Sequence, residues 1–232
     1  MKIEIWSDVM CPFCYIGKRR FEAALQQFAH KNEVEIEWKS FQLNPNLVTD
    51  TTISSAQYLA DKKGVTIDHA HQMHNHVTQM AAEVGLTYNL DKAVVANSFD
   101  AHRFAHLAKQ KGLGIEAEEA LFKAYFTDSK NIADHDTLAQ LGESIGLNAN
   151  EVISALATAQ FADDVNHDVY EAQQLGINAV PFFVMDRKYG VSGAQAVPTF
   201  LQTLDKAYTE WAATKPQLNV IKGDSCEIGG DC

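Results

Sequence analysis

A stretch near the N-terminus decides the fold, and it reads Ile3-Glu4-Ile5-Trp6-Ser7-Asp8-Val9-Met10-Cys11-Pro12-Phe13-Cys14. Residues 2–7 alternate polar with apolar side chains, which predicts a β-strand. From Pro12 onward the apolar side chains recur at every third or fourth position, which predicts a helix. Proline is tolerated in the first turn of a helix, because the N–H group that it lacks has no partner there. Two cysteines therefore stand where a strand ends and a helix begins.

This position favours redox chemistry at the two thiols. The free N–H groups and the positive end of the helix dipole lie beside Cys11 and favour its thiolate. Cys14 is three residues further along and on the same face of the helix. Cys11 can therefore attack a disulfide and form a mixed disulfide, which Cys14 then resolves. The alternatives are two buried small apolar side chains, or half of a zinc site completed by Cys226 and Cys232.

The rest of the chain predicts one sheet interrupted by helices. We expect a second strand at residues 34–43, six or seven helices between residues 54 and 175, strands at residues 177–185 and 189–193, and a last helix over residues 198–211. Helices are expected to begin at Asp68, Asp134 and Asn148. Because an isolated two-stranded ribbon is marginally stable, both strand-bearing ends should share one sheet. The fold class is therefore α/β with an inserted helical block.

Composition excludes several classes of function. The chain of 232 residues is 46% hydrophobic and 21% charged, with a formal net charge of −11. We therefore expect neither nucleic acid nor an anionic membrane surface as a partner. No apolar run approaches the roughly 20 residues that span a bilayer, and residues 1–6 do not resemble a secretory signal, so we expect a cytoplasmic protein. Four cysteines are too few for a disulfide scaffold.

Four segments carry a resemblance to a known family. They are residues 7–17, 41–45, 97–103 and 176–183, and the most specific parts are Cys11-Pro12-Phe13-Cys14 and Val180-Pro181. Together they resemble DsbA-like thioredoxin-fold oxidoreductases, and within these the FrnE-like branch. Relatives of that branch include 2-hydroxychromene-2-carboxylate isomerases and kappa-class glutathione transferases.

The resemblance implies a thioredoxin-like fold with a large inserted all-helical subdomain. Residues 1–52 and 165–213 would form the thioredoxin-like domain, and residues 53–164 would form the insertion. Residues 214–232 would be a C-terminal tail that carries a cysteine pair.

The resemblance also implies thiol–disulfide oxidoreductase activity and the residues that serve it. Cys11 would attack and Cys14 would resolve, with Pro12 and Phe13 beside the substrate. The Val180–Pro181 peptide bond would be cis and would face the sulfur of Cys11, so that the backbone beside it can pair with a substrate peptide. The alternative is a Pro181 that merely begins a strand.

The expected substrates are protein or low-molecular-weight disulfides and dithiols. A thioredoxin or glutathione system would supply electrons, with glutathione as a candidate co-substrate and no cofactor beyond the redox-active disulfide. No metal site is expected. Two alternatives stay open. One is a glutathione-dependent isomerase or transferase, although such relatives typically use a lone serine as the nucleophile. The other is a stress protein that binds soft metals or acts as a holdase.

Two positions depart from the family pattern. Phe13 stands where periplasmic DsbA oxidases have a histidine, which helps to hold the reduced thiolate. We therefore expect a less oxidising cysteine pair. Ile5 stands six residues before Cys11, where thioredoxin and DsbA carry a buried acid. Water or another group must then take the proton of Cys14.

The tail holds the second cysteine pair, Cys226 and Cys232, which resembles a C-terminal pair of many FrnE-like chains. Three interpretations compete for it. The pair is a local disulfide or two free thiols, a redox relay to Cys11 and Cys14, or a soft-metal site.

Four further features are given little weight. Four histidines lie between residues 69 and 76, but a helix puts them on opposite faces, so they cannot share one ion. His102 and Arg103 are either a surface pair or substrate contacts. The acids of residues 116–119 suit the first turn of a helix, and Phe122, Tyr125 and Phe126 fit a core stripe.

Overall fold

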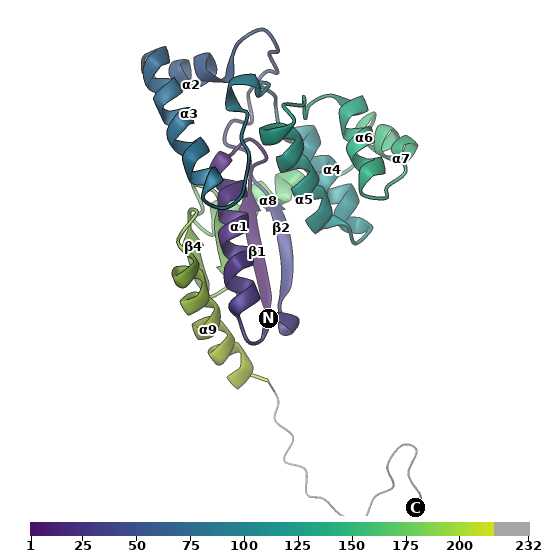
Figure 1. The fold of residues 1–232 in the computed structure, drawn as a ribbon. Coiled ribbons are helices and arrows are strands. Elements are labelled where there is room, and N and C mark those ends of the chain that lie inside the picture. Colours follow the sequence, from purple (N-terminus) through teal and green to yellow (C-terminus); the bar gives the residue numbers. More distant parts are fainter. Residues whose placement is uncertain (216–232) are drawn as a thin grey trace, which may run out of the picture.

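The computed structural model describes residues 1–215, in which four strands form one mixed sheet (Figure 1). The strands are β1 (Lys2–Ser7), β2 (Glu35–Ser40), β3 (Phe182–Met185) and β4 (Tyr189–Ser192), in the order β2-β1-β3-β4. β1 runs parallel to β2 and antiparallel to β3, and Ile5 lies between Trp38 and Phe183. The two strand-bearing ends of the chain therefore share one sheet, which confirms the predicted fold class.

Nine α-helices are present in the described residues. They are α1 (Pro12–Gln27), α2 (Ser55–Lys63), α3 (Ile67–Ala82), α4 (Phe99–Gln110), α5 (Gly114–Phe122), α6 (His135–Ser144), α7 (Ala149–Leu156), α8 (Ala162–Gln174) and α9 (Val197–Ala213). Seven of them, α2 to α8, lie between β2 and β3, within the predicted number. Within residues 1–215, no helix has both the length and the apolar character needed to cross a membrane.

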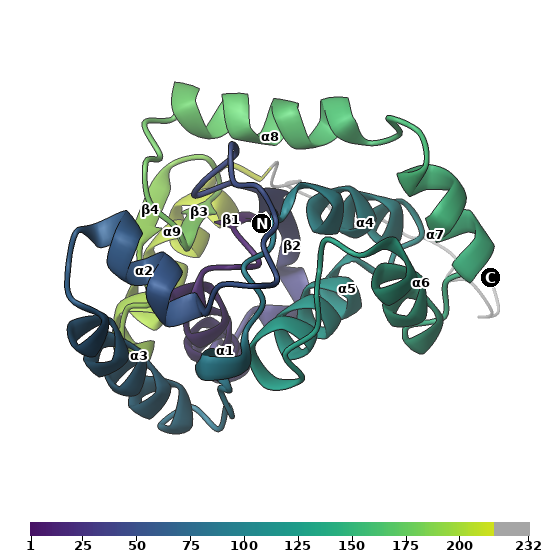
Figure 2. The ribbon, with the colours of Figure 1, turned by 90° about the horizontal axis from the view of Figure 1, so that it is seen from above.

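Helices cover both faces of the sheet. Figure 2 shows α8 on one side of the sheet and α1 on the other. The alternation of β1 explains this arrangement, because successive side chains of a strand point to opposite faces. Trp6 faces α8 and donates its indole N–H to the carbonyl oxygen of Asp168, 2.9 Å away. Ile3 and Ile5, which are fully buried, therefore face α1.

The inserted helices form two groups, α2–α3 and α4–α7, on either side of the end of β1 (Figure 1). Stacked aromatic rings join α1 to the insertion. The ring of Tyr15 stacks on that of Phe122 at 5.0 Å between centroids, and Tyr88 stacks on Phe126 at 4.7 Å. Phe122, Tyr125 and Phe126 are all buried, which confirms that they belong to a core stripe.

The predicted element boundaries were right in some places and wrong in others. Asp134 and Asn148 cap α6 and α7 as expected, but α3 is capped by Thr66, whose hydroxyl accepts the N–H of His69. Asp68 lies inside the first turn instead. The apolar run 177–185 becomes a strand only from Phe182, because the preceding proline has no N–H for the ladder.

His102 and Arg103 are neither a surface pair nor substrate contacts, because both are buried, at 1% and 5% exposure. The last carbonyl groups of a helix have no hydrogen-bond donor within the helix. At the end of α7, Arg103 provides the missing donors. Its guanidinium donates to the carbonyl oxygens of Ala155 at 2.7 Å and of Gln160 at 2.9 Å. The sequence interpretation failed here because helical spacing does not show which face another helix will cover. Arg103 thus holds α4 to α7 and the turn after it.

Replacing Arg103 by Met tests this role. The substitution keeps the apolar stem but leaves several buried carbonyl groups without a donor, so the free energy of unfolding should fall by about 3–5 kcal/mol. Lys111→Met is the matched control, since Lys111 pairs with Glu151 where both side chains are 43% exposed. That change should stay within about 0.5 kcal/mol. Urea unfolding followed by circular dichroism measures both, and equal effects would contradict the assignment.

Candidate active site

Cys11 lies at the junction that the sequence predicted. It follows β1 and is the N-cap residue of α1, with Pro12 in the first helical position. Its backbone N–H donates to the carbonyl oxygen of Asp8, and its own carbonyl accepts the N–H of Cys14, each at 2.9 Å. The side chain is 4% exposed and makes no capping hydrogen bond. The sulfur therefore sits in the positive field of the helix end without being tied to its N–H groups.

A second loop reaches the Cys11 sulfur from far along the chain. The Val180–Pro181 peptide bond is cis, as the resemblance implied. The Cys11 thiol donates to the carbonyl oxygen of Val180, 3.5 Å away and 169 residues apart in sequence. Both loop residues are buried against α1. This contact brings two of the predicted substrate-binding residues, Val180 and Pro181, to the cysteine pair.

The close approach of this loop depends on Gly17. A Cβ atom at this position would lie 2.8 Å from Cγ of Pro181, which is shorter than a normal contact. Gly17 is in α1, one turn beyond Cys14, so its missing side chain lets the helix and the loop touch. Gly17 was not among the site residues predicted from the sequence.

Cys14 is fully buried below Cys11, and both are free thiols. Burial raises the pKa of the Cys14 thiol well above its ordinary value, and the adjacent Cys11 raises it further. The Ser7 hydroxyl and the Asp8 backbone N–H lie against its sulfur and oppose this rise. Cys14 is therefore a poor nucleophile until a neighbouring group takes its proton.

Asp8 and His102 form a buried ion pair behind the cysteines. The two side chains are 1% and 2% exposed, and Nε2 of His102 lies 3.6 Å from Oδ1 of Asp8. Burial alone would raise the pKa of Asp8, but His102 and the N–H of Leu43 hold it below its ordinary value. Burial would lower the pKa of His102, but Asp8 raises it. The sequence analysis missed the role of Asp8, although it lies in the motif that carried the resemblance.

The helical insertion also contacts the cysteine motif. The Tyr88 hydroxyl, which is buried, donates to the carbonyl oxygen of Pro12 at 2.7 Å. Phe13 is 41% exposed, so its ring faces solvent beside Cys11. Cys226 and Cys232 lie outside the described residues.

The acids of residues 116–119 are not a simple first-turn cluster. Glu116 lies in the first turn of α5, but Glu119 bridges to α1. Its carboxylate pairs with Arg19 and accepts the Tyr15 hydroxyl, 2.6 Å away. Burial alone would raise the pKa of Glu119, but Arg19, Lys18 and Tyr15 lower it to about 2. This pairing ties the active-site helix to the insertion.

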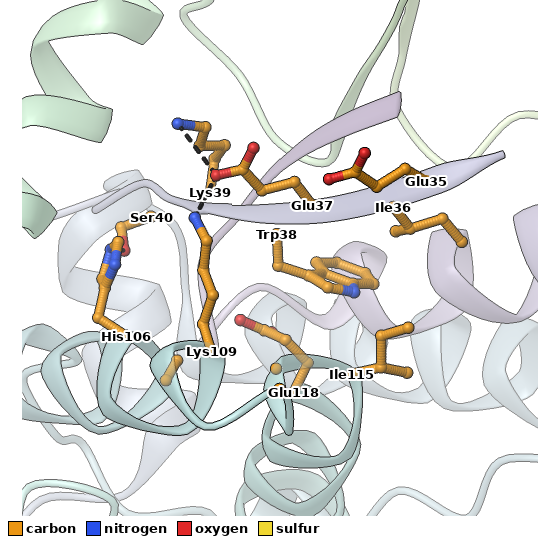
Figure 3. A pocket seen from close by; sticks show the side chains of 13 residues that line it. Glu35, Ile36, Glu37, Trp38, Lys39, Ser40, His106, Lys109, Ile115 and Glu118 are labelled. Atoms are coloured by element: carbon orange, nitrogen blue, oxygen red, sulfur yellow. Dashed lines mark hydrogen bonds and ion pairs between the residues drawn. The ribbon is translucent and has the colours of Figure 1, made fainter. Parts of the chain in front are cut away.

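A cavity of about 360 Å³ opens along β2, between that strand and α4 and α5 (Figure 3). Trp38, His106, Lys109 and Glu118 are among the side chains that line it. The carboxyl group of Glu118 points into the cavity toward Trp38 (Figure 3). In residues 1–215, no three His, Cys, Asp or Glu side chains are placed to hold a metal ion together. The histidines of α3 point largely to solvent, with His74 half-buried.

Three comparisons with known proteins bear on this site. Residues 2–205 match the model of the DSBA-like thioredoxin domain family. YwbO of Bacillus subtilis is 31% identical over an alignment of 195 residues, and the match covers 79% of this chain and 86% of that protein. The crystal structure of SCO1869 from Streptomyces coelicolor, described as a probable DsbA oxidoreductase, is 38% identical with a TM-score of 0.86 and covers 99% of this chain and 97% of its own.

A more distant structure shares the fold alone. The cytosolic disulfide reductase DsbM from Pseudomonas aeruginosa, determined with GSH, has a TM-score of 0.62 at 15% identity. The match covers 92% of this chain and 98% of DsbM.

The unequal environments of the two thiols predict selective alkylation. At about pH 7.5, iodoacetamide should modify Cys11 at least about tenfold faster than Cys14, because Cys14 is buried and its pKa is raised. Peptide mass spectrometry of the reduced protein measures the two rates. In denaturant the rates should become equal, and equal rates in the folded protein would contradict the prediction.

Proposed function

The chain belongs to the DSBA-like thioredoxin domain family, and from this we propose that it is a thiol–disulfide oxidoreductase acting through Cys11 and Cys14. One observation carries the proposal. The Cys11 sulfur lies at a helix N-terminus, 3.5 Å from the Val180 carbonyl oxygen, with the Cys14 thiol buried beneath it. One thiol is thus placed for attack from outside and the other for attack from within.

The reaction proceeds by two exchanges. The Cys11 thiolate attacks one sulfur of a substrate disulfide, so that a Cys11–substrate disulfide forms and one substrate thiolate leaves. Cys14 then loses its proton and attacks the Cys11 sulfur, which releases the second substrate thiolate and leaves a Cys11–Cys14 disulfide. The substrate gains two electrons and the protein loses two. The reverse sequence oxidises a dithiol substrate.

The surroundings of Cys11 suit a peptide or a small disulfide. The Val180 backbone is placed to pair with an extended substrate, while Pro12 and the exposed ring of Phe13 offer apolar contact. Phe13 carries no charge to hold a thiolate, so the pair should be less oxidising than that of DsbA, whose potential is about −120 mV.

We place the protein on the reducing side of the cell's thiol chemistry. The structural likeness to DsbM, which was determined with GSH, supports glutathione as a source of electrons, with a thioredoxin system as the other candidate. A cytoplasmic location fits this direction, because that pool keeps thiols reduced. Membership of the FrnE-like branch belongs to the same proposal.

The tail pair has three proposed roles. Cys226 and Cys232 act as a relay to the active site, as a local disulfide or free thiols, or as a soft-metal site. Turnover by the Cys226→Ser/Cys232→Ser protein separates the relay from the other two.

Single-cysteine variants test the proposed function. Cys11→Ser should abolish disulfide turnover, because no attacking thiol remains. Cys14→Ser should still attack once and then accumulate a mixed disulfide at Cys11, visible as added mass in the intact protein. Reduction of oxidised glutathione and of a disulfide-linked peptide gives the rates. Full turnover by Cys11→Ser would refute the proposal, and glutathione-dependent isomerisation by Cys14→Ser would favour the isomerase alternative.

Gly17→Ala tests the placement of the Val180–Pro181 loop. The added methyl group would meet Pro181 at 2.8 Å and push the loop away from Cys11, so turnover should fall about tenfold or more. Gly114→Ala is the matched control, since its nearest neighbour would be Lys109 at 3.4 Å. The two proteins should differ in turnover while both remain folded, and equal turnover would argue against the contact.

A further inference from the structure

Three buried polar atoms without a hydrogen-bond partner belong to β1, which leads to the cysteines, and to α4 and α5, which border the cavity at β2. They are Oγ of Ser7, Nε2 of His102 and Oε2 of Glu118, half of the six such side-chain atoms in the described residues. Leaving a buried polar group without a hydrogen bond is costly, so such a group calls for a reason. Ser7 is in β1, His102 is in α4 and Glu118 is in α5.

Each neighbouring pair in this series is in contact or within electrostatic reach. The Ser7 hydroxyl lies against the Cys14 sulfur, and the next residue, Asp8, lies 3.6 Å from Nε2 of His102. The charge of His102 lowers the pKa of Glu118, and the charge of Asp8 raises it. Its carboxyl group also lines the cavity (Figure 3). The series therefore begins at the buried thiol and ends at a space large enough to admit water.

The proposed reaction requires such a route. Cys14 must lose a proton before it can attack, its thiol is fully buried, and Ile5 stands where the family pattern has an acid. Glu118 has the properties of an acceptor at neutral pH. Burial raises its pKa to about 7, although His102 and Lys18 oppose this rise.

We propose that Asp8, His102 and Glu118 form the route by which the proton of Cys14 leaves, with Glu118 as its acceptor at the cavity. This inference rests on the proposed function and names the missing acceptor of the resolving step. The Cys14 proton passes to the buried Asp8–His102 pair, and His102 passes a proton to the Glu118 carboxylate. The Cys14 sulfur then bonds to the Cys11 sulfur, the bond from Cys11 to the substrate breaks, and Glu118 releases the proton through the cavity.

The other charged groups nearby leave Glu118 free to act. Lys18 is buried but already pairs with Glu22, 2.6 Å away, and with Glu119, 2.5 Å away. The charge of Asp168 raises the pKa of His102, and that of Asp8 raises the pKa of Tyr125. The charges of the two thiols raise the pKa of Tyr88. None of these three takes the place of Glu118 at the cavity.

The test follows the resolving step itself. Reduced protein is mixed with one equivalent of 5,5′-dithiobis(2-nitrobenzoate), which releases one coloured thiolate when Cys11 attacks and a second when Cys14 resolves. The rate of the second release is measured from about pH 5.5 to about 8.5 in wild type and Glu118→Gln. In wild type the rate of the second release should rise with pH and level off above about pH 7, where Glu118 becomes ionised.

Glu118→Gln should lose this plateau and resolve about tenfold more slowly at pH 7.5, with a rate that keeps rising with hydroxide. Glu118→Asp should retain a plateau, because the acid is kept. His106→Gln is the matched control: it lies one turn along α4 from His102 and lines the same cavity, but it pairs with Asp168 at 3.0 Å. Its pH profile should match wild type.

The outcomes separate this inference from the proposed function. Superimposable pH profiles for wild type and Glu118→Gln would overturn the proton route, while two-phase release would still support the oxidoreductase. Release of no second thiolate by wild type would overturn the proposed function. If Glu118→Gln does not fold, as thermal unfolding would show, His102→Gln decides the question: loss of the plateau supports the route, and a pH profile that matches wild type rejects it.

Discussion

The antiparallel pairing of β1 with β3 is the constraint on which the site depends. It sets Ile5 opposite Phe183 and so brings the loop before β3 to the end of β1. The Cys11 thiol can then donate a hydrogen bond to the Val180 carbonyl oxygen, although the two residues are 169 positions apart in the sequence. Gly17 allows the final approach, since any larger residue would strike Pro181. The seven helices between β2 and β3 can therefore vary their packing only as far as this pairing permits.

Charge and burial organise the space behind the cysteines. Asp8, Lys18, His102 and Glu118 are each no more than 5% exposed, and this is costly for ionisable groups. Lys18 is matched by two carboxylates and Asp8 by His102, whereas one oxygen of Glu118 has no partner. The incomplete match lies on the side of the active site that faces the cavity. The same groups connect α1, α4 and α5, so the chemistry of Cys14 and the attachment of the insertion share residues.

Sequence patterns were reliable where neighbours along the chain decide the structure. The strand before Cys11, the helix after it and the caps of α6 and α7 were all predicted. Asp68 was misassigned because Thr66, two residues earlier, competes for the same capping role. His102 and Arg103 were misread because their partners come from other elements. Glu118 gave no signal, since nothing in the acidic segment 116–119 distinguishes the buried Glu118 from the exposed Glu116.

The sequence by itself determined where the two thiols stand: Cys11-Pro12-Phe13-Cys14 lies at a strand–helix junction, with spacing set by the regular geometry of the helix. The order of its elements indicated an α/β sheet with an inserted helical block, and the resemblance of four segments indicated the thioredoxin-like class. Only the tertiary structure decided what surrounds those thiols. Burial, the Val180 contact and the Asp8–His102–Glu118 series arise where distant segments pack, and exposure and partners depend on that packing rather than on local periodicity.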